Sequence, residues 1–310
     1  MKIIKILVLI FLFVFFSILF LLYNNLDLSK KILVLRLNFY LQAIIVASIL
    51  ALSGWVLQIL LFNPLAEPYL IGVSGAASFG AVISVFLQLT PLFFFRTLFS
   101  LCGSFVFTFL VITLSRKREN FSFEKAILLG VSFNSLFSGF IVLLQSFLLP
   151  NDFYSSVRWL MGNFEHISYL EMILLLTGLF VIFLFVFLSK KELYIYQTGI
   201  EMALSVGVDV ERLKLLGFFC VAFATGISVS LCGMIGFVGL IVPHIARMVF
   251  KEWKENIFTA VMFISMIIII IALWGSRNLV KGTIIPLGVL TSIIGAPFFI
   301  YLLLNRRIRI

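Results

Sequence analysis

The sequence has few charged residues. Asp, Glu, Lys and Arg make up 12% of its 310 residues, whereas a soluble domain carries about 25%. Hydrophobic residues make up 63%, 37 residues are Phe, and the mean hydropathy is +1.22. A water-soluble fold of this size cannot bury so much apolar surface. The composition therefore excludes a soluble enzyme, a disordered protein and a nucleic-acid-binding domain, and it indicates that lipid surrounds most of the chain.

Metal and nucleotide motifs are also missing. The chain has two His and three Cys, none of them in a C-x-x-C pair, so we predict no metal site and no cofactor. It has no G-x-x-x-x-G-K-[ST] phosphate loop, so we do not expect this chain to be an ATPase. All 13 acidic residues fall in predicted loops or at the ends of predicted spans. Ion-coupled carriers usually place a carboxylate near the bilayer midplane, so this pattern favours another energy source. Backbone carbonyls can bind Na⁺, which keeps a secondary carrier open as an alternative.

What the sequence does contain is a series of long apolar runs. A helix needs about 20 apolar residues to cross a bilayer. This criterion predicts an all-α polytopic membrane protein, a single domain over 1–310, with ten transmembrane helices. We interpret the first run as a retained helix, because no signal-peptidase site follows it. The predicted spans are 6–22, 39–61, 70–89, 92–114, 126–149, 169–188, 213–232, 235–250, 257–274 and 285–304.

The basic residues predict the orientation of these spans. With the N-terminus inside, the cytoplasmic segments hold 16 of the 23 Lys and Arg residues and the outer segments hold 7. Cytoplasmic loops carry the excess of Lys and Arg in membrane proteins. We therefore expect both termini to be cytoplasmic. The net charge of +10 fits contact with anionic membrane lipid, and no nucleic-acid partner is expected.

The longest cytoplasmic segment, 189–212, is too polar to cross the membrane. Within it, 199–207 predicts a short amphipathic helix that ends at Gly207, and Asp209 predicts the cap of the next helix. A short helix at the cytoplasmic surface suits docking of a soluble partner. The other interpretation is a helix that only rests on lipid head groups.

Three stretches resemble one family. The first is Ser53-Gly54 through Gln58 to Asn63-Pro64-Leu65-Ala66-Glu67-Pro68 and Gly72-Val73-Ser74-Gly75. The second is Gly236-Phe237-Val238-Gly239-Leu240-Ile241-Val242-Pro243-His244-Ile245-Ala246-Arg247, and the third is Gly295-Ala296-Pro297. At this order and spacing the chain resembles the permeases of ABC importers for iron–siderophore, haem and vitamin B12. The resemblance covers a core of 33–304.

The resemblance implies a binding-protein-dependent importer at the cytoplasmic (inner) membrane. The permease would form a homodimer, or a heterodimer with a paralogue, with two cytoplasmic ABC ATPase subunits beneath and an extracytoplasmic substrate-binding protein outside. The motifs do not distinguish a ferric siderophore, haem or corrinoid substrate. A secondary carrier and a non-transporting membrane assembly protein are the alternative functions.

The resemblance also assigns residues to roles. The ATPase-coupling loop would be 190–212, with Glu201, Ala203, Gly207 and Arg212. Spans five and ten would line the pathway, with Asn134, Ser135, Ser138 and Pro297. The outer docking surface would include Arg36, Arg277 and Lys281. Each role has a simpler alternative: helix packing for the glycines and prolines, serine hydroxyls bonded within their own helix, and arginines anchored at the lipid interface.

Local expectations accompany these roles. The X-Pro pairs Asn63-Pro64 and Glu67-Pro68 predict the end of the second span and an extended turn. Gly233, Gly236 and Gly239 predict either a smooth helix stripe or an irregular backbone. Gly295-Ala296-Pro297 predicts a break or kink in the last span. We expect His244 to bond the backbone that Pro243 frees.

Overall fold

The computed structural model describes residues 2–22, 30–89, 92–117, 120–250, 257–280 and 282–304. Within these ranges the chain is helical, apart from loops and one antiparallel pair of two-residue strands, which aligns Arg116 with Phe121. The elements are α1 (Lys2–Leu22), α2 (Lys30–Leu60), the 3₁₀ helix η1 (Pro68–Ile71), α3 (Val73–Phe86), α4 (Leu92–Ser115), β1 (Arg116–Lys117), β2 (Asn120–Phe121), α5 (Phe123–Gln145), α6 (Pro150–Leu160), α7 (Tyr169–Tyr196), α8 (Ile200–Ser205), α9 (Val210–Cys232), α10 (Val238–Val249), α11 (Ile257–Asn278) and α12 (Leu287–Leu304).

Seven of the described helices are long and apolar enough to cross a membrane: α1, α2, α4, α5, α7, α9 and α11. Three more apolar helices, α3, α10 and α12, coincide with the other predicted spans but have shorter apolar segments. At about 1.5 Å per residue, α3 and α10 reach only about 20 Å, less than the hydrocarbon core of about 30 Å. The chain is therefore a polytopic α-helical protein, and α3 and α10 alone are too short to cross the hydrocarbon core.

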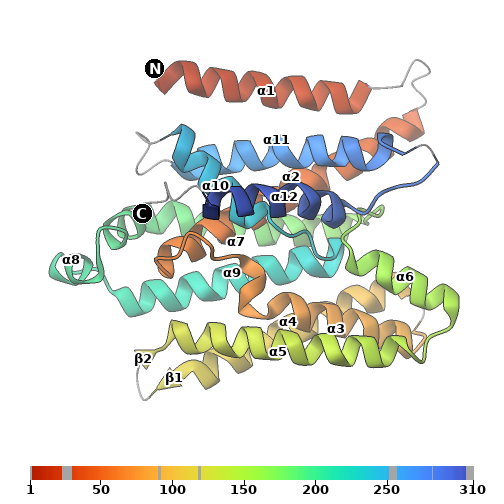
Figure 1. Cartoon of the computed structure of the whole chain (residues 1–310), viewed down its shortest axis with the longest axis horizontal. Coiled ribbons are helices and arrows are strands. Elements are labelled where there is room, and N and C mark those ends of the chain that lie inside the picture. The colour runs from red at the N-terminus through yellow and green to blue at the C-terminus, as the bar shows by residue number, and fades with distance from the viewer. Residues whose placement is uncertain are drawn as a thin grey trace.

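The helices lie side by side along the long axis of the molecule (Figure 1). The first residues of α1, the last described residues of α12, the strand pair and α8 lie at one end, and α6 lies at the other. We call these the α8 end and the α6 end. The two described chain ends thus lie on the same side of the bundle, as the even number of predicted spans requires.

Helix α2 is the centre of the bundle. Of its apolar span, 94% is buried, compared with 11% for α1, which packs at the edge against α11. Helix α2 contacts α7, α9, α10 and α11. Small residues allow this close packing: a Cβ on Gly54 would overlap the carbonyl of Gly239 on α10.

Several predicted boundaries were wrong, for physical reasons. Helix α2 begins at Lys30 rather than at 39, and α7 continues to Tyr196 rather than ending at 188. An apolar window detects only the lipid-facing part of a helix, and hydrogen bonding continues into polar turns. The predicted span 70–89 is divided by Gly72, whose φ is +83°, into η1 and α3. Helix α6, which begins at Pro150, was not predicted.

The glycine and proline motifs have different outcomes. The backbone from Gly233 to Phe237 is irregular, with φ of +70° and +67° at these two residues, and α10 begins only at Val238. By contrast, α12 continues as a helix through Pro297, which contradicts the predicted break; the alternative, a kink, stays a prediction. The second predicted span ends at Leu60, before the X-Pro turn, as expected.

Candidate functional site

Two predictions for segment 199–212 are confirmed: α8 ends near Gly207, and Asp209 caps the next helix, α9. Asp209 caps α9 by accepting a hydrogen bond from the backbone N–H of Arg212 at 3.0 Å. Helix α8 ends in a left-handed turn at Gly207, whose φ is +83°. The N–H groups of Gly207 and Val208 donate to the carbonyls of Leu204 and Ala203, which is the Schellman pattern. This turn fixes α8 relative to α9.

One side of α8 packs on the bundle and the other projects outward. Ala203 is fully buried, whereas Glu201 and Arg212 are exposed. Three apolar side chains are exposed: Met202 and Leu204 by more than half, and Ile200 by 40%. Because α8 projects at an end of the bundle (Figure 1), these side chains form an apolar surface suited to a soluble partner or to the lipid interface.

A hydrogen-bonded clasp joins α2 to α10. Pro243 has no N–H, so it cannot bond the carbonyl of Gly239 four residues earlier. A side chain of α2 supplies the missing donor. Nε2 of Gln58 donates to the carbonyls of Gly239 and Leu240, both at 3.2 Å. Its Oε1 accepts from Nη2 of Arg247. The expectation that His244 bonds this backbone was therefore wrong; the His244 ring lies edge-on to Phe298 of α12.

The loop after α2 holds the first residues of α10. Oε1 of Glu67 accepts the N–H of Phe237, the residue that precedes α10, at 2.6 Å. A carboxylate is favourable at the positive end of a helix dipole. Burial raises the pKa of Glu67, and the hydrogen bond from Phe237 opposes this shift. The Tyr69 hydroxyl accepts the N–H of Ile235 at 2.7 Å and donates to its carbonyl at 3.1 Å.

The remaining residues of this loop shape the turn. Oδ1 of Asn63 accepts the N–H of Leu65 at 2.9 Å, which forms an Asx turn around Pro64. Pro68 begins η1 and lies beside α10, because a Cβ on Gly239 would come within 2.7 Å of its Cδ. The two family-like motifs, 63–68 and 236–247, therefore contact each other directly and support the two short helices α3 and α10. Below, the clasp means the contacts of Gln58, Glu67, Tyr69, Gly239 and Arg247.

The predicted pathway residues do not share one environment. Asn134 bonds the backbone: its Nδ2 donates to the carbonyl of Tyr69 at 2.9 Å, and its Oδ1 accepts the N–H of Gly75 at 3.1 Å. That N–H is in the first turn of α3, so Asn134 supplies a cap from another helix. Ser135 donates to the carbonyl of Val131 in its own helix, and Ser135, Ser138 and Pro297 are exposed in the single chain.

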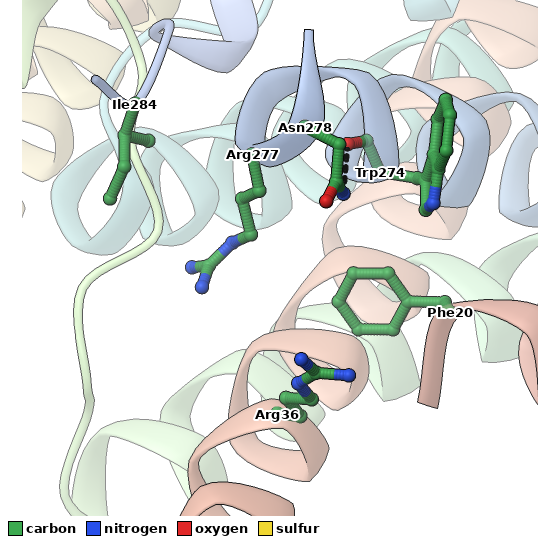
Figure 2. Close-up of a pocket in the computed structure, with 6 residues that line it drawn as sticks. All are labelled: Phe20, Arg36, Trp274, Arg277, Asn278 and Ile284. Carbon is green, nitrogen blue, oxygen red and sulfur yellow. Dashed lines mark hydrogen bonds between the residues drawn. The ribbon is translucent and has the colours of Figure 1, made fainter. Parts of the chain in front are cut away.

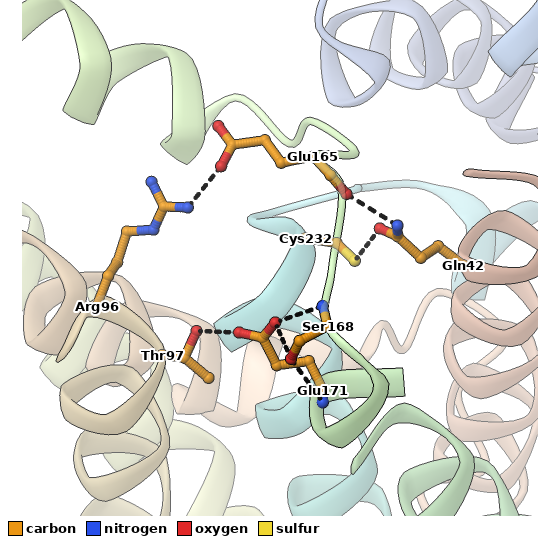
Figure 3. Close-up of polar contacts among 7 residues, drawn as sticks. All are labelled: Gln42, Arg96, Thr97, Glu165, Ser168, Glu171 and Cys232. Carbon is orange, nitrogen blue, oxygen red and sulfur yellow. Dashed lines mark hydrogen bonds and ion pairs between the residues drawn. The ribbon is translucent and has the colours of Figure 1, made fainter. Parts of the chain in front are cut away.

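A polar network secures segment 161–168 at the α6 end (Figure 3). Arg96 of α4 forms an ion pair with Glu165 at 2.7 Å and lies over the Trp159 ring. Gln42 of α2 donates to the carbonyl of Glu165 at 2.8 Å. Glu171 begins α7 in a capping box with Ser168. These contacts fix segment 161–168 to α2 and α4. A hydrogen bond from Thr97 to Glu171 also joins α4 to the first turn of α7.

The comparisons with known proteins agree with this architecture. Residues 3–305 match the model of the FecCD transport family. The chain belongs to the FecCD transport family. It is 32% identical over 281 residues to the vitamin B12 import system permease protein BtuC of Vibrio vulnificus, covering 89% of this chain and 84% of that protein. It is 27% identical over 277 residues to the iron(3+)-hydroxamate import system permease protein FhuG of Bacillus subtilis, covering 87% and 82%.

A solved structure also resembles this FecCD protein. It is a metal-chelate type ABC transporter in an inward-facing conformation, with a TM-score of 0.82 and 28% identity, covering 95% of this chain and 96% of that one. The chain is thus a multi-pass membrane protein and an ABC importer permease of the FecCD and BtuC type. Its homologues are permease subunits, which are not themselves enzymes.

The predicted docking arginines of the FecCD chain lie together at the α6 end. Arg36 and Arg277 line one cavity of about 280 Å³ (Figure 2). Lys281 lies outside the described residues. Sequence reasoning missed the roles of Gln58 and Tyr69, although Gln58 lies in a quoted motif and Tyr69 directly follows Pro68 of the same motif. The signal for Gln58 was available: Pro243 inside an apolar helix leaves a carbonyl that needs a donor from elsewhere.

Proposed function

We propose that this FecCD permease moves a metal chelate of the iron–siderophore, haem or cobalamin type into the cytoplasm, using ATP hydrolysed by two partner ATPase subunits. It works as a homodimer of ten-span subunits with both termini cytoplasmic. A substrate-binding protein delivers the chelate at the outer side. The observation that carries the proposal is the family match over nearly the whole chain, together with the projecting α8.

The orientation is supported by the charges at the two ends of the bundle. The α8 end carries the α8 segment, the basic strand pair and the first residues of α1. Most of the Lys and Arg residues of the predicted cytoplasmic segments belong to this end. The positive-inside rule therefore directs α8 to the cytoplasm, where the ATPase subunits are. Closure of the ATPases would move α8, and the Schellman turn at Gly207 would transmit that motion to α9.

The dimer is supported by α5. Only 11% of its apolar span is buried within one chain, and its exposed face includes the hydroxyl-bearing Ser135 and Ser138. Hydroxyl side chains gain little from facing lipid tails, and they are useful at helix–helix contacts or along a polar pathway. A second copy facing α5 would place the pathway between the subunits, as the resemblance implies.

The substrate class follows from the relatives only in outline. One relative is named for vitamin B12 and another for iron(3+)-hydroxamate. Both are bulky metal chelates, and the described residues contain no group of three or more His, Cys, Asp or Glu residues placed to hold a metal ion. The permease is therefore expected to conduct the whole chelate without taking up the metal from it.

Transport assays test the function directly. Proteoliposomes that hold the permease with its ATPase and binding protein should take up one of three radiolabelled probes: cyanocobalamin, a ferric hydroxamate or haem. Uptake should need ATP and the binding protein and should resist ionophores. Uptake without the ATPase that collapses with an ionophore would identify a secondary carrier. An assembled, ATP-hydrolysing complex that takes up none of the three probes would favour an assembly role.

Cysteine labelling tests the pathway separately. In a variant without the three native cysteines, Ser135→Cys and Ser138→Cys should react with a membrane-impermeant thiol reagent during turnover. Thr177→Cys is the matched control, because Thr177 is exposed on α7 and bonds only its own helix. The cysteine at position 177 should stay unreactive. If the cysteines at 135 and 138 also stay unreactive in every nucleotide state, this face of α5 does not line the pathway.

A further inference from the structure

Helix α12 is anchored to the bundle at its beginning. The N–H of Leu287 donates to the carbonyl of Gly162 at 2.8 Å. A Cβ on Gly288 would overlap the carbonyl oxygen of the residue that follows α6, so the first turn of α12 lies directly on that backbone. Among residues 292–301 of this helix, only Gly295 is buried. Beyond its first turns, α12 therefore depends on the contact at Gly295 to stay beside the bundle.

The contact at Gly295 is made by Phe237, the residue that precedes α10. A Cβ on Gly295 would overlap the Cβ and Cγ of Phe237, so the Phe237 side chain lies directly on the backbone of α12. Farther along α12, the Phe298 ring lies edge-on to His244 of α10, with the ring centroids 6.4 Å apart. The closest contact between α10 and α12 in this region is thus the one that Phe237 makes.

Phe237 makes this contact with an unfavourable backbone conformation. Its φ is +67°, in the left-handed region, which a bulky residue other than glycine seldom adopts. Such a conformation persists only where neighbouring contacts enforce it, and it is often found at functional positions. Oε1 of Glu67 accepts the Phe237 N–H at 2.6 Å, and the Phe237 carbonyl accepts the N–H of Ile241 at 2.9 Å. The peptide groups on both sides of Phe237 are thereby fixed, and its side chain is directed at α12.

These contacts join three separate parts of the chain. Glu67 lies in the loop before η1, Phe237 at the start of α10, and Gly295 in α12. A Cβ on Gly236 would lie 3.8 Å from Oε1 of Glu67 and 3.9 Å from Oγ of Ser292, so the loop and α12 approach the same residue. A change of φ at Phe237 to the extended region would redirect its Cα–Cβ bond and remove the side chain from Gly295. Helix α12 would then be free to pivot about its anchored first turn.

We propose that Phe237 is a positioning residue for transport: its ring keeps α12 against α10, and release of its left-handed conformation lets α12 pivot about its first turn. This inference rests on the proposed function, in which α12 belongs to the pathway. Because Glu67 accepts the Phe237 N–H, the loop before η1 and α12 change position together. Phe237 acts on the substrate only through the position of α12.

The distance between α10 and α12 tests the proposal without a transport assay. In a variant without the native cysteines, spin labels at Met248→Cys and Tyr301→Cys report the separation of these helices at the α8 end, since both positions are exposed. Dimers that hold one labelled subunit keep the measurement within one chain. Gly295→Ala should lengthen the mean distance by about 1–2 Å or more, the size of a typical helix shift. Gly236→Ala is the matched control and should leave the distance unchanged, because its Cβ would come no closer than 3.8 Å to another atom.

Two further comparisons separate the ring from the backbone. Phe237→Gly accepts the left-handed conformation but has no ring, so the α10–α12 distance distribution should become about twofold wider. Adding Gly295→Ala to Phe237→Gly should change the distribution no further, because the side chain that the new Cβ would meet is gone. Glu67→Leu removes the acceptor for the Phe237 N–H and should also widen the distribution. Glu67→Gln keeps an acceptor oxygen and should retain the wild-type distance.

The outcomes distinguish this inference from the proposed function. Distances unchanged in both Gly295→Ala and Phe237→Gly would overturn the role of Phe237. A shift in Gly295→Ala that persists in the Phe237→Gly background would overturn it as well, because α12 would then respond to the alanine without the ring. If the wild type takes up none of the three probes, the proposed function fails, and the distances still decide whether Phe237 positions α12.

Coupling provides the functional measurement. In Gly295→Ala, uptake per ATP hydrolysed should fall about fivefold, because α12 no longer holds its wild-type position during the conformational cycle. Wild-type uptake per ATP in a variant whose α10–α12 distance has shifted would refute the positioning role in transport.

Discussion

The clasp and α8 use polar and apolar groups in opposite ways. In the clasp, Gln58 is buried and Glu67 is partly buried, and both bond backbone groups near the start of α10. In α8, Met202 and Leu204 are exposed and contribute little to the fold of the single chain. The clasp therefore holds α10 against α2, whereas α8 offers an exposed apolar surface. Substitutions should separate these roles. Changes in the clasp should lower the stability of the permease, and changes in α8 should lower the coupling of ATP hydrolysis to uptake.

The largest expected effect is at Gly54, where α2 and α10 touch. Gly54→Val should destabilise the protein by about 3 kcal/mol or more, because its Cβ would overlap the backbone of Gly239 and neither helix can move aside easily. Thermal unfolding in detergent measures the loss. Gly275→Val is the matched control, because a Cβ on Gly275 would come no closer than 3.4 Å to another atom, which is ordinary van der Waals contact. Equal unfolding temperatures for the two variants would show that the close approach of α2 and α10 is not required.

The next effect is at Gln58, the polar centre of the clasp. Gln58→Leu leaves the Gly239 carbonyl and the Arg247 guanidinium without their partner, and we expect a loss of about 2 kcal/mol. Gln58→Glu keeps an acceptor for Arg247 but removes the donor to Gly239, so its loss should be smaller. Gln197→Leu, at an exposed position, should change stability by less than about 0.5 kcal/mol. A Gln58→Leu variant as stable as the wild type would contradict the role of this bond.

These effects also explain how much of the structure the sequence could predict. Each of the ten predicted spans coincides with an apolar helix. Both the hydropathy of a window and helical hydrogen bonding are determined by residues close together in the sequence. The cap at Asp209 and the end of α8 near Gly207 were predicted for the same reason. The orientation of the helices in the membrane remains a prediction. The excess of Lys and Arg on one side indicates how the protein is placed in the membrane, and the fold alone does not test this.

The clasp and the arginine cavity could not be predicted in the same way. Gln58 and Arg247 are far apart in the sequence, as are Arg36 and Arg277, and no local pattern indicates which pairs meet. His244 was the nearest polar residue to Pro243, so local reasoning chose it, whereas the fold brings Gln58 to the free carbonyl. The pathway role of Asn134 stays a prediction, and the sequence did not indicate which groups its amide bonds. In the structure it caps α3 from another helix, a contact that depends on packing.

The smallest expected effect on stability, with the largest on coupling, is at Gly207. Gly207→Val places a β-branched residue at φ +83°, which costs about 1–2 kcal/mol and favours unwinding of the Schellman turn. Because a Cβ there would meet no atom within 4 Å, the cost is confined to the backbone. We expect the permease to remain folded in the membrane but to lose ATP-dependent uptake and stimulation of its ATPase.

The control at this position is Gly207→Asn, because Asn adopts the left-handed conformation far more readily than Val. If α8 transmits motion from the ATPase through this turn, the Asn variant should keep most of the uptake while the Val variant loses it. Because the two variants differ in backbone preference, a difference in uptake at similar protein levels would trace coupling to the turn itself. Normal uptake and ATPase stimulation in the Val variant would remove α8 from the coupling pathway and leave it as a helix resting on the lipid surface.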